Sequence, residues 1–216
     1  MGELINDPFR AARLVLHLRR QGITDHGVLN VIERVRRADF VDPAYADLGD
    51  EDCLLPLPCG QTQQRPSLIA SVLQSLGLEP GVSIRILLIG EDSGYMAALL
   101  SELGHHVYVV SRFHTLVQHM RQRFEQKDLT KIRVTHGDPQ LGWTSMAPFH
   151  RIVIFGGLEE VGEDLLDQLN PDGFCVASLV RGPGQILTKI NRGGSEIGAL
   201  GPIKAAQIRP GASSVL

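Results

Sequence analysis

One short segment of the chain combines glycines with side chains that can take part in chemistry. It directly follows the apolar run 84–89 and reads Gly90-Glu91-Asp92-Ser93-Gly94-Tyr95. In a parallel α/β sheet, ligands bind beyond the carboxyl ends of the strands. A glycine turn at such a place lets the backbone approach a ligand and aims the amides of the next helix at it. These six residues are therefore candidates for binding a small molecule.

The chemistry of this turn limits which ligand it can hold. Asp92 stands where a dinucleotide-binding GxGxxG fingerprint has its middle glycine, so the fingerprint is absent. The carboxylates of Glu91 and Asp92 would repel a pyrophosphate, which argues against NAD or FAD. The alternative is a plain strand-to-helix turn in which the two acids only cap the helix.

Strand and helix patterns alternate around this turn. Apolar runs typical of buried parallel strands lie at 84–89, 107–110, 132–135, 151–155 and 174–177. Helical spacing is found at 67–77, 95–103, 115–125 and 163–169. This alternation predicts a parallel sheet with helices on both faces. In the weaker pattern after Arg181, the runs 186–190 and 203–208 around a Gly-Gly turn predict an antiparallel hairpin at the sheet edge.

Two amphipathic helices are expected before the sheet. The first runs from Pro8 to Gly22 with Asp7 as its N-cap, and the second from Asp25, which caps it, to Arg37 with solvated arginines. Residues 39–66 are rich in Asp, Pro and Gly and predict a long loop with one short strand, and loops of this length often carry function. We therefore expect an N-terminal helical region with its loop (1–66) and a sheet core (67–216), packed as one compact domain.

The composition bounds the class of protein. With 216 residues, 43% hydrophobic and 21% charged, the chain can bury one substantial core, and its net charge of −3 gives no general attraction to nucleic acid or an anionic membrane. Three cysteines without a CxxC pair indicate neither a disulfide framework nor a zinc site, and the histidines lack metal-site spacing. Neither a signal peptide nor a membrane-spanning stretch is recognisable, so we expect a cytoplasmic protein without a metal.

Further motifs lie along the chain in a fixed order. They are LPLPCGQTQQRP at 55–66, LLIGEDSGYMAALL at 87–100, GD at 137–138, LGW at 141–143 and APF at 147–149. In this combination the chain resembles the protein-L-isoaspartate O-methyltransferases, which methylate damaged aspartyl residues of proteins with S-adenosylmethionine. The resemblance runs from about residue 8 to the end. It implies the Rossmann-like, doubly wound, mostly parallel sheet of a class I methyltransferase, with N-terminal helices and a C-terminal antiparallel edge.

The same resemblance assigns roles to individual residues. The segment 90–95 would hold S-adenosylmethionine, Ser111 at the end of the second strand would meet its ribose, and Asp138 its adenine amino group. The family's loop pattern GQTxSQP carries a serine associated with catalysis where this chain has Gln64. Thr62 offers a hydroxyl two residues earlier, and Gln64 can donate hydrogen bonds to a carboxylate, while loop packing is the alternative role for both.

The chain also departs from the family pattern. Leu88 replaces an acid of the turn, Asp92 its central glycine, and His150 an aspartate. Ser111 replaces the acid that grips both ribose hydroxyls, a loss of about 1.5–3 kcal/mol. Buried like charges without partners at Glu91 and Asp92 would cost several kcal/mol more. These four changes and Gln64 are expected to cluster on one catalytic rim, while the apolar framework is kept. We therefore expect a family-like protein with a degraded cofactor and catalytic site, a weakly active or inactive pseudoenzyme that acts through binding or regulation.

The alternative is an active S-adenosylmethionine-dependent carboxyl methyltransferase, because methyl transfer chiefly needs an aligned carboxylate and a positioned sulfonium. Its acceptor would be isoaspartyl residues of damaged proteins or another group, so the partner is a protein or peptide substrate if the chain is active and a protein partner otherwise. The arginines of the first 40 residues either pair with the acidic stretch 42–52 or form a docking patch for an acidic partner. The sequence sets neither the oligomeric state nor which of the two functions holds.

Overall fold

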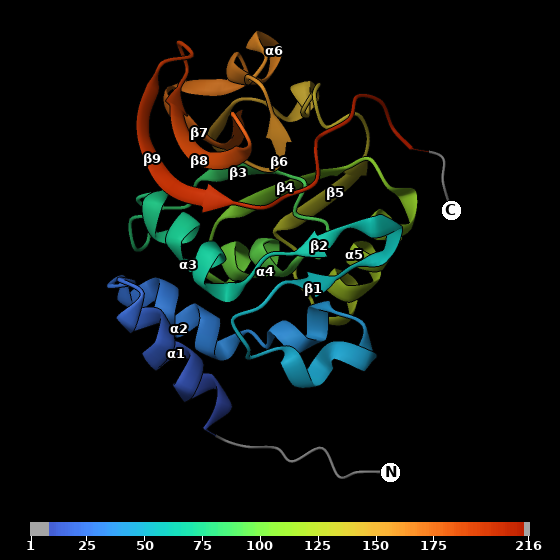
Figure 1. Cartoon of the computed structure of the whole chain (residues 1–216). Coiled ribbons are helices and arrows are strands. Elements are labelled where there is room, and N and C mark those ends of the chain that lie inside the picture. Colours follow the sequence, from blue (N-terminus) through green and yellow to red (C-terminus); the bar gives the residue numbers. More distant parts are fainter. Residues whose placement is uncertain (1–8, 214–216) are drawn as a thin grey trace.

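The computed structural model describes residues 9–213, and a single large sheet organises them (Figure 1). Within these residues the sheet has seven strands in the order β5-β4-β3-β6-β7-β8-β9. Neighbours from β5 to β7 are parallel, and β7, β8 and β9 are antiparallel. The strands are β3 (Arg85–Ile89), β4 (His106–Ser111), β5 (Ile132–His136), β6 (Phe149–Leu158), β7 (Leu169–Arg181), β8 (Gly184–Asn191) and β9 (Glu196–Ile203).

Helices cover both faces of this sheet, which confirms the α/β arrangement predicted from the alternation of strands and helices. The helices of the core are α3 (Pro66–Ser75), α4 (Tyr95–Glu102), α5 (His114–Gln126) and α6 (Glu163–Leu166). In β3, Ile86 and Leu88 pack in one core cluster with α3, α4 and α5, and Leu87 and Ile89 pack in a second with α6. Because both faces of β3 are covered, its residues form the continuous apolar run seen in the sequence.

Two further helices pack on the α3 and α4 side, as expected. They are α1 (Arg10–Arg20) and α2 (His26–Arg34), and the Asp25 carboxylate accepts a hydrogen bond from Val28 N at 3.0 Å, which confirms it as the cap of α2. The Asp7 cap lies outside the described residues. Arg10 forms an ion pair with Asp47 at 3.8 Å, so the basic helix α1 meets the acidic stretch 42–52.

The second helix ends earlier than predicted because its last arginine turns inward. The α2 helix stops at Arg34, and Arg37 begins the short 3₁₀ turn η1 (Arg37–Phe40). The prediction that Arg37 is solvated is wrong, since only 1% of it is exposed. Its guanidinium donates to four loop carbonyls, Gly49 O at 3.5 Å, Glu51 O at 3.1 Å, Cys53 O at 2.8 Å and Gln64 O at 3.1 Å. One buried cation therefore holds the long loop in place.

The long loop has more structure than the single short strand predicted. It contains a two-stranded antiparallel ribbon, β1 (Leu55–Pro56) and β2 (Thr62–Gln63), and the 3₁₀ turns η2 (Pro43–Leu48) and η3 (Pro58–Gly60). Strands this short need outside support, which Arg37 provides through the carbonyls before and after the ribbon.

The C-terminal hairpin forms, but its second strand was predicted in the wrong place. Strand β9 ends at Ile203, where the predicted strand 203–208 begins. The turn after β8 is tight, because Asn191 N donates to Ser195 O at 3.0 Å and Asn191 Oδ1 accepts from Ser195 N at 2.9 Å, so pairing resumes at Glu196. Residues 204–213, called the strap below, instead cross the carboxyl ends of the parallel strands. No helix among residues 9–213 is long and apolar enough to cross a membrane.

The role of Arg37 predicts a large stability effect. Replacing it with alanine leaves several loop carbonyls without a donor, so Arg37→Ala should lower the free energy of unfolding by about 3 kcal/mol. The matched control is Arg36→Ala, since the adjacent Arg36 is exposed, and it should change this energy by less than about 0.5 kcal/mol. Urea unfolding of the three proteins measures both, and equal stability of the two variants would contradict the role of Arg37.

Candidate functional site

The turn between β3 and α4 depends on its two glycines. Gly90 and Gly94 have φ values of +73° and +82°. A Cβ atom on Gly90 would lie 2.6 Å from Phe155 O, and one on Gly94 would lie 2.7 Å from the Phe124 ring. Only glycine satisfies both demands, the left-handed backbone and the close approach. The turn is thereby fixed at the carboxyl end of the central strand.

Glu91 faces the start of α4. Its carboxylate accepts hydrogen bonds from the Ser93 hydroxyl and from Gly94 N, the latter at 3.1 Å, and 5% of the residue is exposed. Burial raises the pKa of Glu91 to about 7, against the lowering effect of the Ser93 hydrogen bond, and neighbouring Asp92 raises it further. A carboxylate at a helix N-terminus is in a favourable place. Glu91 thus acts as a helix cap.

A crevice opens beyond the ends of β3 and β4, next to this turn. It encloses about 550 Å³. Its floor and sides come from the strand ends, from the long loop and from the strap. The lining residues that bear on its chemistry are Gly90, Asp92, Ser111, Arg112, Cys59 and Gln61. The crevice therefore has the position at which α/β sheets bind their ligands.

Asp92 is the one residue of the acidic pair that reaches the crevice. It is 6% exposed, and its Oδ1 atom is buried without a hydrogen-bond partner among the described residues. Burial raises the pKa of Asp92 to about 6, while hydrogen bonding with Ser111 lowers it. Ser111 is itself 1% exposed, and its Oγ accepts from Phe113 N at 3.2 Å. A carboxylate and a hydroxyl thus share one wall of the crevice.

Of the six candidate residues of the turn, two line the crevice and four support it. Gly90 and Asp92 line it. Ser93 bonds the Glu91 carboxylate and, through its Oγ, Tyr95 N at 3.1 Å. The Tyr95 side chain is buried on the helix side, 5.6 Å from the Phe40 ring between centroids. Glu91 and Gly94 complete the cap, so these four residues shape the turn.

Asp138 lies beside the crevice with its carboxylate already bonded. Asp138 Oδ1 accepts from Gln140 N at 2.9 Å, and Oδ2 accepts from Gly211 N of the strap at 2.6 Å. The next residue, Pro139, lines the crevice. Asp138 therefore adjoins a crevice residue along the chain, and its carboxylate is bonded to the strap.

The strap forms the outer wall of the crevice, which the sequence analysis missed. Ile208 N donates to Gly157 O at 3.1 Å, Gly157 N donates to Ala206 O at 2.9 Å, and Ser213 N donates to Arg112 O at 2.7 Å. A Cβ atom on Gly156 would lie 2.3 Å from Ile208 Cδ1. Glycine within a strand often marks the close approach of another segment, so the pair 156–157 after an apolar run was the available signal.

The two candidate catalytic residues of the loop lie in different surroundings. Gln64 is 7% exposed, and its Nε2 donates to Lys204 O of the strap at 3.3 Å. With Arg65, Leu68 and Lys204 it lines a groove of about 760 Å³ beside the turn 182–184, and no carboxylate lines this groove. Thr62 is exposed in β2 and lines neither cavity. Instead its neighbour Gln61 reaches the crevice.

Two of the departures from the family pattern lie away from the crevice. Leu88 is fully buried in the core cluster on the α4 side. His150 lies at the start of β6, where its Nδ1 accepts from Arg85 N at the start of β3 at 3.1 Å, and burial lowers its pKa. That is the amino end of the strands, opposite the crevice. The expectation that all five changes cluster on one catalytic rim is therefore wrong for Leu88 and His150.

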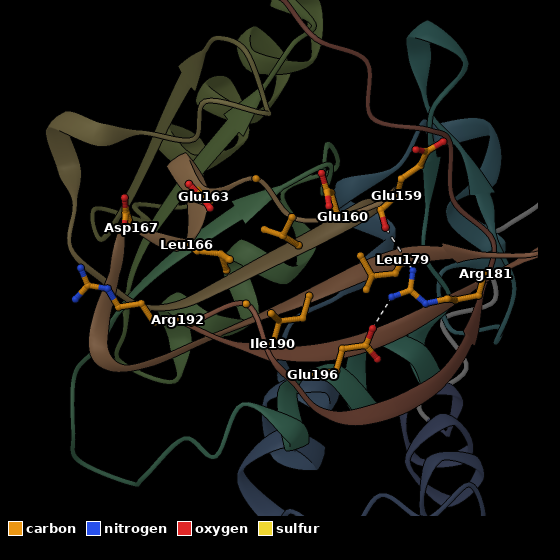
Figure 2. Close-up of a pocket in the computed structure, with 14 residues that line it drawn as sticks. Glu159, Glu160, Glu163, Leu166, Asp167, Leu179, Arg181, Ile190, Arg192 and Glu196 are labelled. Atoms are coloured by element: carbon orange, nitrogen blue, oxygen red, sulfur yellow. Dashed lines mark hydrogen bonds and ion pairs between the residues drawn. The ribbon is translucent and has the colours of Figure 1, made fainter.

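A second pocket, between α6 and the β7–β8 hairpin, is lined mainly by charged surface side chains (Figure 2). Arg181 crosses it and contacts the Glu196 carboxylate and Glu159 O. No residue of the glycine turn lines this pocket, and the described residues contain no group of three or more metal-ligating side chains. The crevice is therefore the better candidate for the functional site.

The fold and the crevice together define a class. A mostly parallel sheet with an antiparallel edge, a glycine turn after the central strand and a crevice at its carboxyl end are those of an S-adenosylmethionine-dependent methyltransferase fold. The family model for protein-L-isoaspartate(D-aspartate) O-methyltransferase (PCMT) matches residues 10–200. This chain belongs to that family.

Named relatives are similar over most of their length. A protein-L-isoaspartate O-methyltransferase of Cronobacter sakazakii is 40% identical over 187 residues, which cover 87% of this chain and 88% of the relative. One from Caulobacter sp. strain K31 is 36% identical over 201 residues, which cover 92% of this chain and 91% of the relative. A beta-aspartate methyltransferase of Plasmodium falciparum, crystallised with S-adenosyl-L-homocysteine, shares the fold with a TM-score of 0.78 at 20% identity, covering 91% of this chain and 97% of that one.

The environment of Glu91 predicts a pH dependence of stability. Its pKa rises from an ordinary 4.5 to about 7 on folding, so the folded protein holds this proton more tightly than the unfolded chain. The free energy of unfolding should therefore fall as the pH rises from about 4.5 to about 7. Glu91→Gln removes the titrating group but keeps an acceptor for Gly94 N, so this fall should become shallower.

The matched control is Glu102→Gln, which changes an exposed carboxylate at the other end of the same helix. It should leave the slope as in the parent protein. Urea unfolding at pH 4.5, 5.5, 6.5 and 7.5 measures all three proteins. A Glu91→Gln slope equal to that of the parent would show that Glu91 does not contribute to this fall.

Proposed function

We propose that this protein is an active S-adenosylmethionine-dependent carboxyl methyltransferase that acts on isoaspartyl residues of damaged proteins. The observation that carries the proposal is the orientation of Glu91. Because its carboxylate caps α4, the crevice contains one acid of the pair and is not blocked by two like charges. Identities of 36–40% to named family enzymes over most of the chain support the same function.

The crevice residues fit the family's cofactor. Asp92 has an unpartnered buried oxygen that a ligand donor can satisfy, and its negative charge favours a cationic ligand. Gly90 and Ser111 line the same crevice, and Asp138 directly precedes Pro139, which also lines it. S-adenosylmethionine would supply a methyl group made electrophilic by its sulfonium. The residues of this chain would bind and orient the molecule and exclude water from it.

The acceptor carboxylate needs no base from the protein. A carboxyl group of ordinary pKa is already ionised at neutral pH, so the protein must bind and align it. The groove beside Gln64 suits this task, since it holds the cations Arg65 and Lys204 and no carboxylate. Gln64 Nε2 can donate a hydrogen bond to the acceptor in place of the serine hydroxyl of the family pattern. We assign Gln64 a positioning role, and Thr62 is a second candidate for it.

One observation favours the competing function, a retained scaffold that acts through binding. The strap already bonds the Asp138 carboxylate and packs Ile208 over Gly156. A cofactor that uses Asp138 must displace Gly211 or bind beside it. If the strap does not yield, the crevice stays closed to S-adenosylmethionine, and the protein would act through a protein partner. The expected cytoplasmic location remains a prediction.

The proposed function predicts selective methylation. Incubated with labelled S-adenosylmethionine, the protein should methylate a peptide with one isoaspartyl residue and leave the matched aspartyl peptide nearly unlabelled. Mass spectrometry of the product should show one added methyl group, released at alkaline pH as expected for an ester. No labelling of the isoaspartyl peptide, despite cofactor binding, would contradict the enzyme and support the binding function.

The groove predicts a separate effect for Gln64. Losing one hydrogen bond to a charged acceptor costs about 1.5 kcal/mol, so Gln64→Ala should lower kcat/KM for the isoaspartyl peptide about tenfold. Binding of S-adenosylhomocysteine should not change, because Gln64 does not line the crevice. Gln64→Ser should recover part of the rate. The control Gln122→Ala, an exposed side chain on α5, should have no effect. A loss in Thr62→Val but not in Gln64→Ala would move the role to Thr62.

A further inference from the structure

We infer that Asp92 and Ser111 together bind the ribose hydroxyls of the adenosyl group, and that Asp92 supplies the carboxylate which the end of β4 lacks. The inference rests on the proposed function, since it names the residues by which this crevice would hold the sugar of its ligand. The carboxylate that accepts hydrogen bonds from the ribose hydroxyls would thus come from the turn between β3 and α4.

The sheet register places both residues at the ribose position. In open α/β sheets a nucleoside lies over the glycine turn, and its ribose meets the end of the next strand, about 20 residues further on. Ile89 pairs with Val110, so Gly90 and Ser111 are the next residues on the two adjacent strands. Asp92 and Ser111 line the crevice on this side. A ribose bound there would lie within reach of both side chains.

The hydrogen-bonding chemistry favours a diol at this position. A carboxylate accepts two hydrogen bonds from neighbouring hydroxyls, whereas Ser111 alone offers a single hydroxyl that already accepts from Phe113 N. Asp92 Oδ1 is buried with no partner among the described residues, a rare condition for such an atom. A ligand hydroxyl would satisfy it.

The backbone of the turn accepts a side chain at residue 92. Among residues 9–213, the non-glycine residues with positive φ are Cys59 and Asp128, so Asp92 has an ordinary backbone conformation and needs no glycine. Glu91 occupies the α4 N-terminus, which leaves the crevice wall to Asp92. Arg112 follows Ser111 in the same lining and brings a positive charge to it. The acid is therefore accommodated where the family pattern has a glycine.

The sugar itself provides the test. Calorimetry compares the binding of S-adenosylhomocysteine with that of its 2′-deoxy and 3′-deoxy analogues. The parent protein should bind at least one analogue about 10- to 100-fold more weakly. Asp92→Asn should weaken the binding of S-adenosylhomocysteine by a similar factor. It should leave the affinity for that analogue nearly unchanged, because the hydroxyl missing from the analogue and the charge missing from the variant belong to one interaction. The control is Asp167→Asn, an exposed acid beside α6, which should bind every ligand like the parent.

A charge exchange gives the second test. The double variant Asp92→Gly, Ser111→Asp returns the acid to the end of β4 and should bind S-adenosylhomocysteine within about threefold of the parent, whereas Asp92→Gly alone should bind about 10- to 100-fold more weakly. Thermal melting by circular dichroism checks that each variant is folded. If Asp92→Asn does not fold, the analogue series on the parent protein and the double variant still decide the matter.

Three results would overturn the inference. Equal affinity of the parent for all three ligands would show that the hydroxyls are not bound. If Asp92→Asn lost affinity for all three ligands by the same factor, the carboxylate would contact another part of the cofactor, and the proposed function would stand. Failure of the parent to bind S-adenosylhomocysteine at millimolar concentration would contradict the proposed function and the inference together.

Discussion

The hydrogen bonds between the Glu91 carboxylate and the start of α4 are the contact on which the site depends. Two acids follow the central strand, and both are buried. If both faced the crevice, their mutual repulsion and desolvation would oppose any ligand that does not neutralise them. Gly94 N and the Ser93 hydroxyl hold Glu91 away from it. The crevice keeps one carboxylate with a free acceptor, which is a property of a binding site.

Segments far apart in the sequence complete the site around this turn. Arg37 fixes the long loop through its carbonyls, which sets Gln61 at the crevice and Gln64 at the groove. The strap then joins the two cavities, because Lys204 O bonds Gln64 and Gly211 N bonds Asp138. Under the proposed function, the crevice would bind the cofactor and the groove would bind the acceptor, so the two cavities would serve the two substrates of a methyl transfer.

The sequence alone predicts those parts of the structure that are determined by neighbouring residues. The apolar run of β3, the Asp25 cap and the glycine turn follow from periodicity and backbone demands, and the family motifs gave the fold. The sequence does not predict the role of a residue where that role depends on the direction in which its side chain points. Whether Glu91 faces helix or crevice depends on the conformation of the turn, which brings Ser93 and Gly94 to its carboxylate. Whether Arg37 faces solvent or core depends on carbonyls of the loop that are 12 to 27 residues away along the chain. The second strand of the hairpin was misplaced because the tight turn at Asn191, which sets its register, was not recognised.

The same limit explains the expectation of a degraded site. From the sequence, the changes at Leu88, Asp92, Ser111, His150 and Gln64 look like one group, but the sheet puts Leu88 in the core and His150 at the opposite end of the strands. Of the other three changes, Gln64 lines the groove, and Asp92 and Ser111 line the crevice together. We infer that Asp92 and Ser111 compensate one another in charge. A single sequence does not show that a carboxylate missing from the end of one strand can be supplied by the turn after the adjacent strand.

A crystal structure of the protein with S-adenosylhomocysteine tests this arrangement most directly. We expect the ligand seated over Gly90, with an Asp92 carboxylate oxygen about 2.6 Å from a ribose hydroxyl and the Glu91 carboxylate still bonded to Gly94 N. A crevice that stays empty at saturating ligand, or a Glu91 side chain turned into it, would contradict this arrangement.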